Sequence, residues 1–90
     1  MKTPGVWGVY VLLCRADTLY TGISCDLPAR YAKHCEGRGA RYTRMYPPRQ
    51  ILAWCPCADR GQASRLEAQI KRMKRDEKWL WIEQHRYTGD

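Results

Sequence analysis

Five side chains in this sequence carry functional groups that are typical of reacting sites. Tyr10 and Tyr20 supply two phenols ten residues apart, Arg30 and His34 supply a guanidinium and an imidazole, and Glu67 adds a carboxylate. The fork of an arginine matches the oxygens of a phosphate, and glutamate is a hard oxygen ligand that suits Mg²⁺ or Mn²⁺. A free phenol, with a pKa near about 10, becomes a base at neutral pH only when nearby cations lower that pKa.

Together these groups could cleave a phosphodiester. That reaction needs an activated water, positive charge at the scissile phosphate and help for the leaving oxygen. Each group also has a structural interpretation. Tyrosine is a common strand residue, and Glu67 could simply pair with Lys71 one helical turn away, which contributes about 0.2–0.5 kcal/mol. The residue types alone do not decide between these interpretations.

The segment that positions the tyrosines is predicted to be a β-hairpin. Two apolar runs, Val9 to Cys14 and Leu19 to Ile23, flank four residues, Arg15 to Thr18, which is typical of strands joined by a short loop. Strand alternation puts Tyr10 on one face, with Leu12 and Cys14, and Val9, Val11 and Leu13 on the other. Pairing around the loop brings Tyr10 and Tyr20 close together on one face.

A helix is predicted from Leu27 to about Cys35 or Glu36. Asp26 is a good N-cap residue, and Gly37 suits the position after the helix end. The expected buried stripe is Leu27, Tyr31 and Cys35. Arg30 and His34 are four residues apart, so we expect them to stack on one flank of that stripe, at the boundary between core and surface.

Most of the excess positive charge lies between residues 30 and 49. This stretch has six basic residues and one acidic residue, Glu36, and it interleaves Tyr42 and Tyr46 with arginines. Arginines and aromatic rings together favour phosphate contact and base stacking; a solvated, mobile loop is the alternative. The candidate nucleic-acid-binding residues are Lys33, Arg38, Arg41, Tyr42 and Arg44, with Lys71 added from the later helix.

The rest of the chain is predicted to form one strand and two helices. Gln50 to Cys55 reads as a third strand, Asp59 to Gly61 as a turn, and residues 62 to 74 as a helix that carries Glu67 beside its apolar stripe. Asp76 is expected to cap a last helix, and residues after His85 are expected to fray. The order β-β-α-β-α-α predicts an α+β fold with a small antiparallel or mixed sheet.

The ordered set of motifs resembles the GIY-YIG nuclease superfamily. Gly8-Val9-Tyr10 and Tyr20-Thr21-Gly22 resemble its two signature triplets, with Val9 and Thr21 in place of the isoleucines, and both are β-branched. Arg30, His34 and Glu67 follow in the family's order and approximate spacing. The resemblance covers roughly residues 7 to 83. With Gly37 to Thr43 after the first helix, the chain looks most like the small stand-alone members of the YhbQ type. The resemblance implies a three-stranded antiparallel sheet flanked by helices.

The resemblance also implies roles for the five residues. Tyr10 and Tyr20 would position and activate the water, Arg30 would bind the scissile phosphate, His34 would support a tyrosine or move the proton, and Glu67 would hold Mg²⁺ or Mn²⁺. The substrate would be DNA, with RNA as an alternative, in DNA repair or recombination. The sequence departs from the family pattern at position 79, where Trp79 replaces an asparagine that several members carry.

Composition is consistent with this interpretation. Ninety residues with a net charge of +7 predict a single domain, residues 1–90, and a polyanionic partner. No apolar run is long enough to span a bilayer or to form a signal-peptide core, and five cysteines without a secretion signal are expected to be free thiols. We expect a cytoplasmic protein with no membrane partner and no small-molecule cofactor.

Two other classes of function stay open at this point. The chain could be a non-catalytic nucleic-acid-binding module on the same scaffold, or an interaction protein whose charge is incidental. Binding alone does not need the carboxylate of Glu67, so the retention of all five polar residues favours the nuclease.

Overall fold

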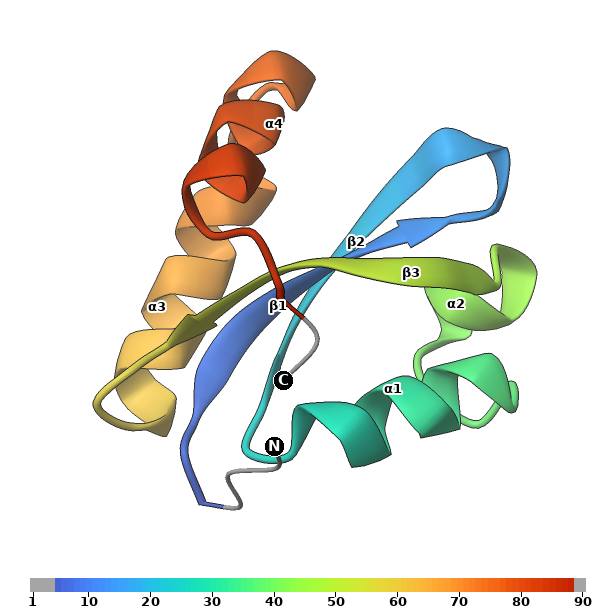
Figure 1. Cartoon of the computed structure of the whole chain (residues 1–90), viewed down its shortest axis with the longest axis horizontal. Helices are drawn as coiled ribbons and strands as arrows, with labels where there is room; N and C mark the ends of the chain where they lie inside the picture. The colour runs from blue at the N-terminus through green and yellow to red at the C-terminus, as the bar shows by residue number, and fades with distance from the viewer. Residues whose placement is uncertain (1–4, 89–90) are drawn as a thin grey trace.

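A computed structural model describes residues 5–88 of the chain (Figure 1). Its first two strands, β1 (Gly8–Cys14) and β2 (Thr18–Ser24), form the predicted antiparallel hairpin. The 3₁₀ turn Arg15–Asp17 joins them, so the loop has three residues rather than the predicted four, because Thr18 already pairs with Cys14. Ala16 and Asp17 have φ angles of 62° and 58°, and two successive positive φ angles give the twist that matches the flanking strands in a tight hairpin.

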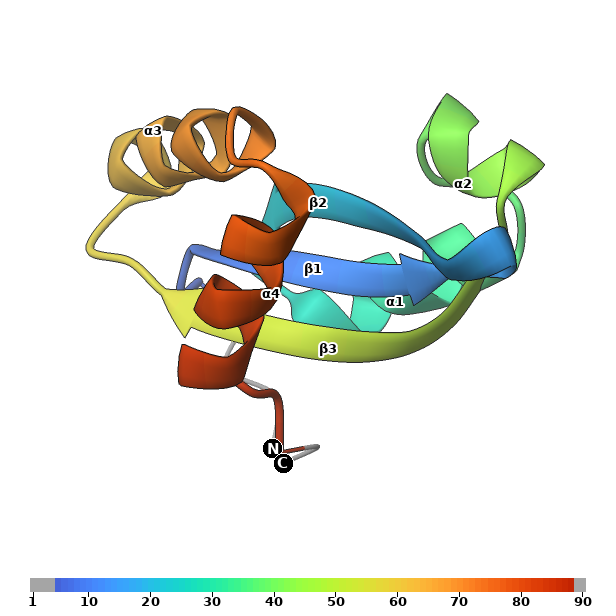
Figure 2. The ribbon, with the colours of Figure 1, turned by 90° about the horizontal axis from the view of Figure 1, so that it is seen from above.

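The third strand, β3 (Pro48–Pro56), pairs antiparallel with β1 on the side away from β2. The strand order is therefore β2-β1-β3 (Figure 2). β3 extends past both ends of the predicted strand, and its register with β1 shifts twice. The sheet is antiparallel throughout, which confirms the α+β fold and excludes the mixed sheet.

Helices cover both faces of the sheet. α3 (Arg60–Lys71) and α4 (Arg75–Gln84) lie on one face, and α1 (Leu27–Cys35) and the short α2 (Arg41–Met45) lie on the other (Figures 1 and 2). The α3 and α4 face buries an aliphatic cluster with one indole: Val9, Val11, Leu52, Ala53, Ala63, Ile70, Trp81 and Ile82. The α1 and α2 face buries Tyr10, Leu12, Cys14 and Leu27, with further tyrosines packed around them.

The two edges of the sheet differ. Along the outer edge of β3, Trp54 N–H donates to the carbonyl of His85, and Tyr87 N–H donates to the carbonyl of Leu52, each at 3.0 Å. The segment after His85 is therefore paired rather than frayed as far as Tyr87; residues 89 and 90 lie outside the description. Among the described residues, no strand pairs with the outer edge of β2.

Four helix predictions need correction. The stretch between the first helix and the third strand, for which no helix was predicted, contains α2. α3 begins at Arg60, because the Asp59 carboxylate accepts from Gln62 N–H at 2.8 Å and caps it, and α3 ends at Lys71 rather than Lys74. α4 starts after Lys74, whose N–H donates to Glu77 at 2.7 Å, so Asp76 lies inside the first turn. None of these helices within residues 5–88 is long and apolar enough to cross a membrane.

The buried side of α1 also differs from the prediction. The bounds of α1 and its Asp26 cap are confirmed, and Gly37 follows with a φ angle of 76°. However, Cys35 is exposed, whereas His34 is buried with 1% of its surface accessible. His34 therefore does not lie at the boundary between core and surface, because α2 packs over the end of α1 and covers it.

Candidate active site

Tyr10 lies at the centre of the site, on the middle strand. Its side chain is 1% exposed and crosses toward the outer edge of the hairpin over Gly22, its partner in the register. A Cβ atom on Gly22 would come within 2.5 Å of the Tyr10 hydroxyl oxygen, so only glycine leaves room for it. The Tyr10 and Tyr20 rings lie on the same face, 6.3 Å apart, which confirms the predicted pairing.

A chain of hydrogen bonds starts at the Tyr10 hydroxyl. Tyr10 Oη lies 2.7 Å from His34 Nε2, and His34 Nδ1 lies 2.7 Å from Thr43 Oγ1. Thr43 donates its only hydroxyl proton to the carbonyl of Ala40 at 2.9 Å, so its oxygen must accept from His34 Nδ1–H. The chain therefore fixes one tautomer: Nδ1 carries the proton, and Nε2 accepts a hydrogen bond from Tyr10.

Two residues that were not among the predicted site residues hold the imidazole in place. Thr43 is 1% exposed and lies on α2, and Gly39 lies in the loop before it. A Cβ atom on Gly39 would collide with the His34 ring. Gly39 therefore makes room for His34. A helix of only five residues, such as α2, leaves almost no periodic signal.

Arg30 acts on both members of the pair. Burial, the largest cause, raises the pKa of Tyr10 to about 12, while a hydrogen bond from Arg30 and its positive charge act in the lowering direction. Burial lowers the pKa of His34, and the charge of Arg30 lowers it further. In the free protein Tyr10 is therefore a neutral phenol that lies beside the charge of Arg30 and donates to a neutral His34.

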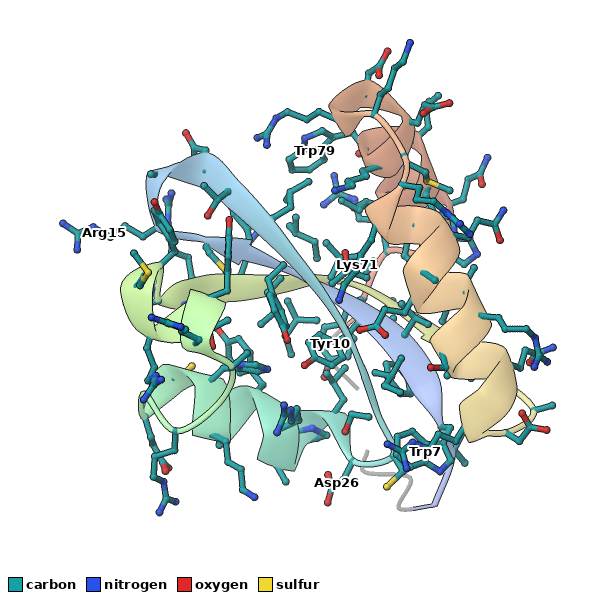
Figure 3. The ribbon with its side chains drawn as sticks, turned by 180° about the vertical axis from the view of Figure 1, so that it is seen from behind. Trp7, Tyr10, Arg15, Asp26, Lys71 and Trp79 are labelled. Carbon is teal, nitrogen blue, oxygen red and sulfur yellow. The ribbon has the colours of Figure 1, made fainter. Side chains whose placement is uncertain are left out.

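Glu67 approaches the site from α3, on the opposite face of the sheet. Its side chain is 22% exposed and forms an ion pair with Lys71 at 3.3 Å. This is the pair that the sequence offered as a structural alternative to a catalytic role for Glu67. Its negative charge also contributes, as the weakest of the causes, to raising the pKa of Tyr10. Lys71, the ion-pair partner of Glu67, lies on the other side of β2 from Tyr10 (Figure 3). Tyr10, Arg30, His34 and Glu67 thus gather around the open edge of β2.

The basic residues lie around α1 and α2 and vary in their availability. Lys33, Arg38, Arg41 and Arg44 are all exposed, but Arg38 pairs with Glu36 at 2.8 Å. Tyr42, the aromatic residue among the predicted nucleic-acid-binding residues, forms part of a row of rings. Its ring stacks on that of Tyr20, with centroids 5.7 Å apart, and the centroid of the Tyr46 ring lies 5.1 Å from that of Tyr42. This row leads from Tyr10 along the surface to α2.

The site offers few ligands for a divalent cation. Within residues 5–88, no group of three or more histidine, cysteine, aspartate or glutamate side chains could hold a metal ion. Glu67 offers a single carboxylate near Tyr10. One carboxylate fits Mg²⁺ or Mn²⁺ when a phosphate and waters fill the other positions, because Mg²⁺ keeps several waters and is often bound in this way.

Comparisons with known proteins agree with the geometry. The family model described as the GIY-YIG catalytic domain matches residues 6–80. A UPF0213 protein of Xanthomonas campestris pv. campestris (strain 8004) is 46% identical over 83 residues, covering 92% of this chain and 81% of that protein. A UPF0213 protein of Nitratidesulfovibrio vulgaris is 44% identical over 77 residues, with 86% and 70% covered.

A solved structure is also similar. The solution NMR structure of a UPF0213 protein from Bacillus halodurans is 32% identical and superimposes with a TM-score of 0.55, covering 86% of this chain and 82% of that one. The match of the family model over most of the chain, together with the three relatives, shows that this protein belongs to the GIY-YIG family, among its small UPF0213 members.

Proposed function

We propose that the protein is a divalent-metal-dependent nuclease that hydrolyses phosphodiester bonds in DNA. The observation that carries the proposal is the buried Tyr10 hydroxyl, which donates a hydrogen bond to the unprotonated Nε2 of His34 at 2.7 Å. A structural hydrogen bond would not need Arg30 and Glu67 to act on the same hydroxyl, as they do here. The family to which the chain belongs supports this assignment.

Tyr10 and His34 move the proton in this proposal. The Tyr10 oxygen takes a proton from the attacking water while its own proton passes to His34 Nε2, a transfer over a 2.7 Å contact. The water oxygen bonds to phosphorus, the bond to the leaving oxygen breaks, and that oxygen takes a proton from solvent water. Imidazolium is unfavourable in the free protein because burial and Arg30 oppose it, and the negative charge of a bound phosphate offsets both effects.

Arg30 and Glu67 complete the site. Arg30 is half-buried beside Tyr10 and can present its fork to the scissile phosphate, while Tyr20 helps to position the water. Glu67 would hold Mg²⁺ or Mn²⁺, releasing its contact with Lys71. When bound, the cation supplies charge stabilisation and a more acidic water. Lys33, Arg38, Arg41, Tyr42, Arg44 and Lys71 would contact the nucleic-acid backbone and bases.

One observation favours a second candidate, a binding module without catalysis. Lys71 neutralises Glu67 at 3.3 Å, which is what a surface ion pair would look like in a protein that only binds nucleic acid. The same scaffold and basic surface would then serve binding to DNA or RNA. For the nuclease, we propose a role in DNA repair or recombination and a preference for the structure of the DNA over its sequence.

The Glu67→Gln variant separates the two candidates. Labelled branched and linear DNA would be incubated with Mg²⁺ or Mn²⁺, with a chelator as the metal-free control. We expect the parent protein to cleave only with metal, and Glu67→Gln to lose about 100- to 1000-fold in rate while binding DNA at least as tightly. Glu83→Gln, which removes the carboxylate of the exposed Arg86 pair, should cleave normally. Metal-independent binding without cleavage by the parent protein would favour the binding module.

A further inference from the structure

A second recess lies at the hairpin end of β2, outside the site described above. It has a volume of about 220 Å³ and is lined by Thr18 and Leu19 of β2, Tyr42 of α2, and Arg75 and Lys78 of α4. These residues come from elements on both faces of the sheet, so the recess spans the unpaired edge of β2. Two hydroxyls, from Thr18 and Tyr42, and two cations make up its polar lining, beside the Tyr42 ring.

The charge of this recess is largely uncompensated. Lys78 is half-buried, and no carboxylate pairs with it among residues 5–88. Arg75 lies above the Trp79 ring and donates to the backbone carbonyl of Asp17 at 2.6 Å, which fixes the guanidinium without neutralising it. The Asp17 carboxylate contacts Arg49 at 3.2 Å. The recess therefore attracts an anion.

The recess is continuous with the candidate active site. The Tyr42 ring that lines it stacks on Tyr20, whose ring lies 6.3 Å from that of Tyr10. Along β2, Thr18 and Gly22 are four residues apart, or about 13 Å. This distance corresponds to roughly four nucleotides at the rise of a duplex strand. A nucleic-acid strand bound at Tyr10 and running along the edge of β2 would reach the recess.

We propose that this recess binds a backbone phosphate of the nucleic-acid substrate, a few nucleotides from the scissile bond, with the attached nucleotide against the Tyr42 ring. The proposal rests on the proposed function and adds a second contact to it. Lys78 and Arg75 provide the charge and Tyr42 the apolar platform, a combination that suits a nucleotide. An acidic peptide would use the two cations but would gain little from the aromatic row.

The test compares two variants that each remove one positive charge. Lys78→Gln changes the recess. Arg65→Gln is the matched control on α3, where Arg65 lines a separate recess of about 470 Å³ beside Cys55 and Cys57. DNA binding would be measured by fluorescence anisotropy with chelator present, between about 50 and 200 mM salt. Because one phosphate contact contributes a slope of about 0.9, Lys78→Gln should weaken binding roughly five- to tenfold at 0.1 M salt and reduce the salt slope by about one.

Lys78→Arg should restore both the affinity and the slope, because a cation returns to the same position. If Lys78→Gln and Arg65→Gln bind alike, the recess makes no phosphate contact, while the proposed function stands. If the parent protein binds no nucleic acid at all, both proposals fail. Circular dichroism would confirm that each variant keeps the helix content of the parent protein.

Discussion

The two faces of the sheet have opposite chemistry, although the same three strands form both. On the α3 and α4 face, called here the aliphatic face, Val9, Val11, Ile70 and Ile82 are all at most 1% exposed and offer no polar atom. On the α1 and α2 face, called the tyrosine face, buried Tyr10, His34 and Thr43 are joined by hydrogen bonds. Consecutive residues of β1 therefore serve different purposes.

The difference shows how a small domain can place a reacting group without losing its core. Burying a polar group costs free energy unless it is hydrogen-bonded, and within residues 5–88 no buried side-chain nitrogen or oxygen atom lacks a partner. The tyrosine face can be polar because its hydrogen bonds are complete. The aliphatic face then supplies most of the apolar burial that stabilises the fold.

Truncation on the aliphatic face should have the largest effect on stability. Ile70 of α3 is fully buried, and Ile70→Ala removes buried methylenes and leaves a cavity, at a cost of about 2–5 kcal/mol. Urea unfolding followed by tryptophan fluorescence would measure this loss. Leu80→Ala serves as the control, because Leu80 is 67% exposed and should change stability by less than about 0.5 kcal/mol. Equal losses for the two variants would contradict the assignment of the core.

On the tyrosine face, Thr43 should affect activity through His34. Thr43→Val keeps the shape but removes the acceptor for Nδ1–H, so we expect the other tautomer to gain population and cleavage to fall about 10- to 100-fold, as for other groups that orient a reacting side chain. Ring ¹⁵N chemical shifts would report the tautomer directly. Thr43→Ser keeps the hydroxyl and should restore both. An unchanged tautomer in Thr43→Val would show that Thr43 does not orient the ring.

A smaller effect should appear in the pH dependence of stability. Burial and Arg30 lower the pKa of His34 in the folded protein, whereas in the unfolded chain His34 titrates near about 6.5. The unfolded state then binds more protons below that pH, so the free energy of unfolding should fall as the pH drops below about 6.5 and stay constant above it. His34→Gln should flatten this dependence in urea titrations between pH 5 and 8; an equally steep curve would exclude His34 as its source.

Much of the tyrosine pair was predictable from sequence. Period-2 alternation and the length of the loop together determine which residues of a hairpin share a face. The three-residue loop pairs Leu12 with Tyr20, which puts Tyr20 on the face of Tyr10. A four-residue loop would have set Tyr20 opposite Leu13, on the other face. Asp26 and Gly37 marked the bounds of α1 because capping chemistry is local. These predictions depend only on neighbours in the chain.

Predictions that depended on tertiary packing were less accurate. Helical periodicity placed Cys35 in the core and His34 at its edge, but α2 covers His34 and leaves Cys35 exposed. The roles of Thr43 and Gly39 arise only when this short helix packs against α1. The pairing of residues 85–87 with β3 is likewise a contact between distant segments, which no local pattern indicates.

The central claim is that the Tyr10 hydroxyl carries out chemistry rather than packing. Tyr10→Phe removes only that hydroxyl; it leaves His34 Nε2 without its donor, a cost of about 1–3 kcal/mol. Tyr31→Phe is the matched control, since Tyr31 is a half-buried tyrosine on the same face outside the hydrogen-bond chain. The decisive measurement is single-turnover cleavage of labelled DNA with Mg²⁺ by both folded variants. The account predicts at least about a 100-fold loss for Tyr10→Phe and the parental rate for Tyr31→Phe. A folded Tyr10→Phe protein that cleaves at the parental rate would contradict it.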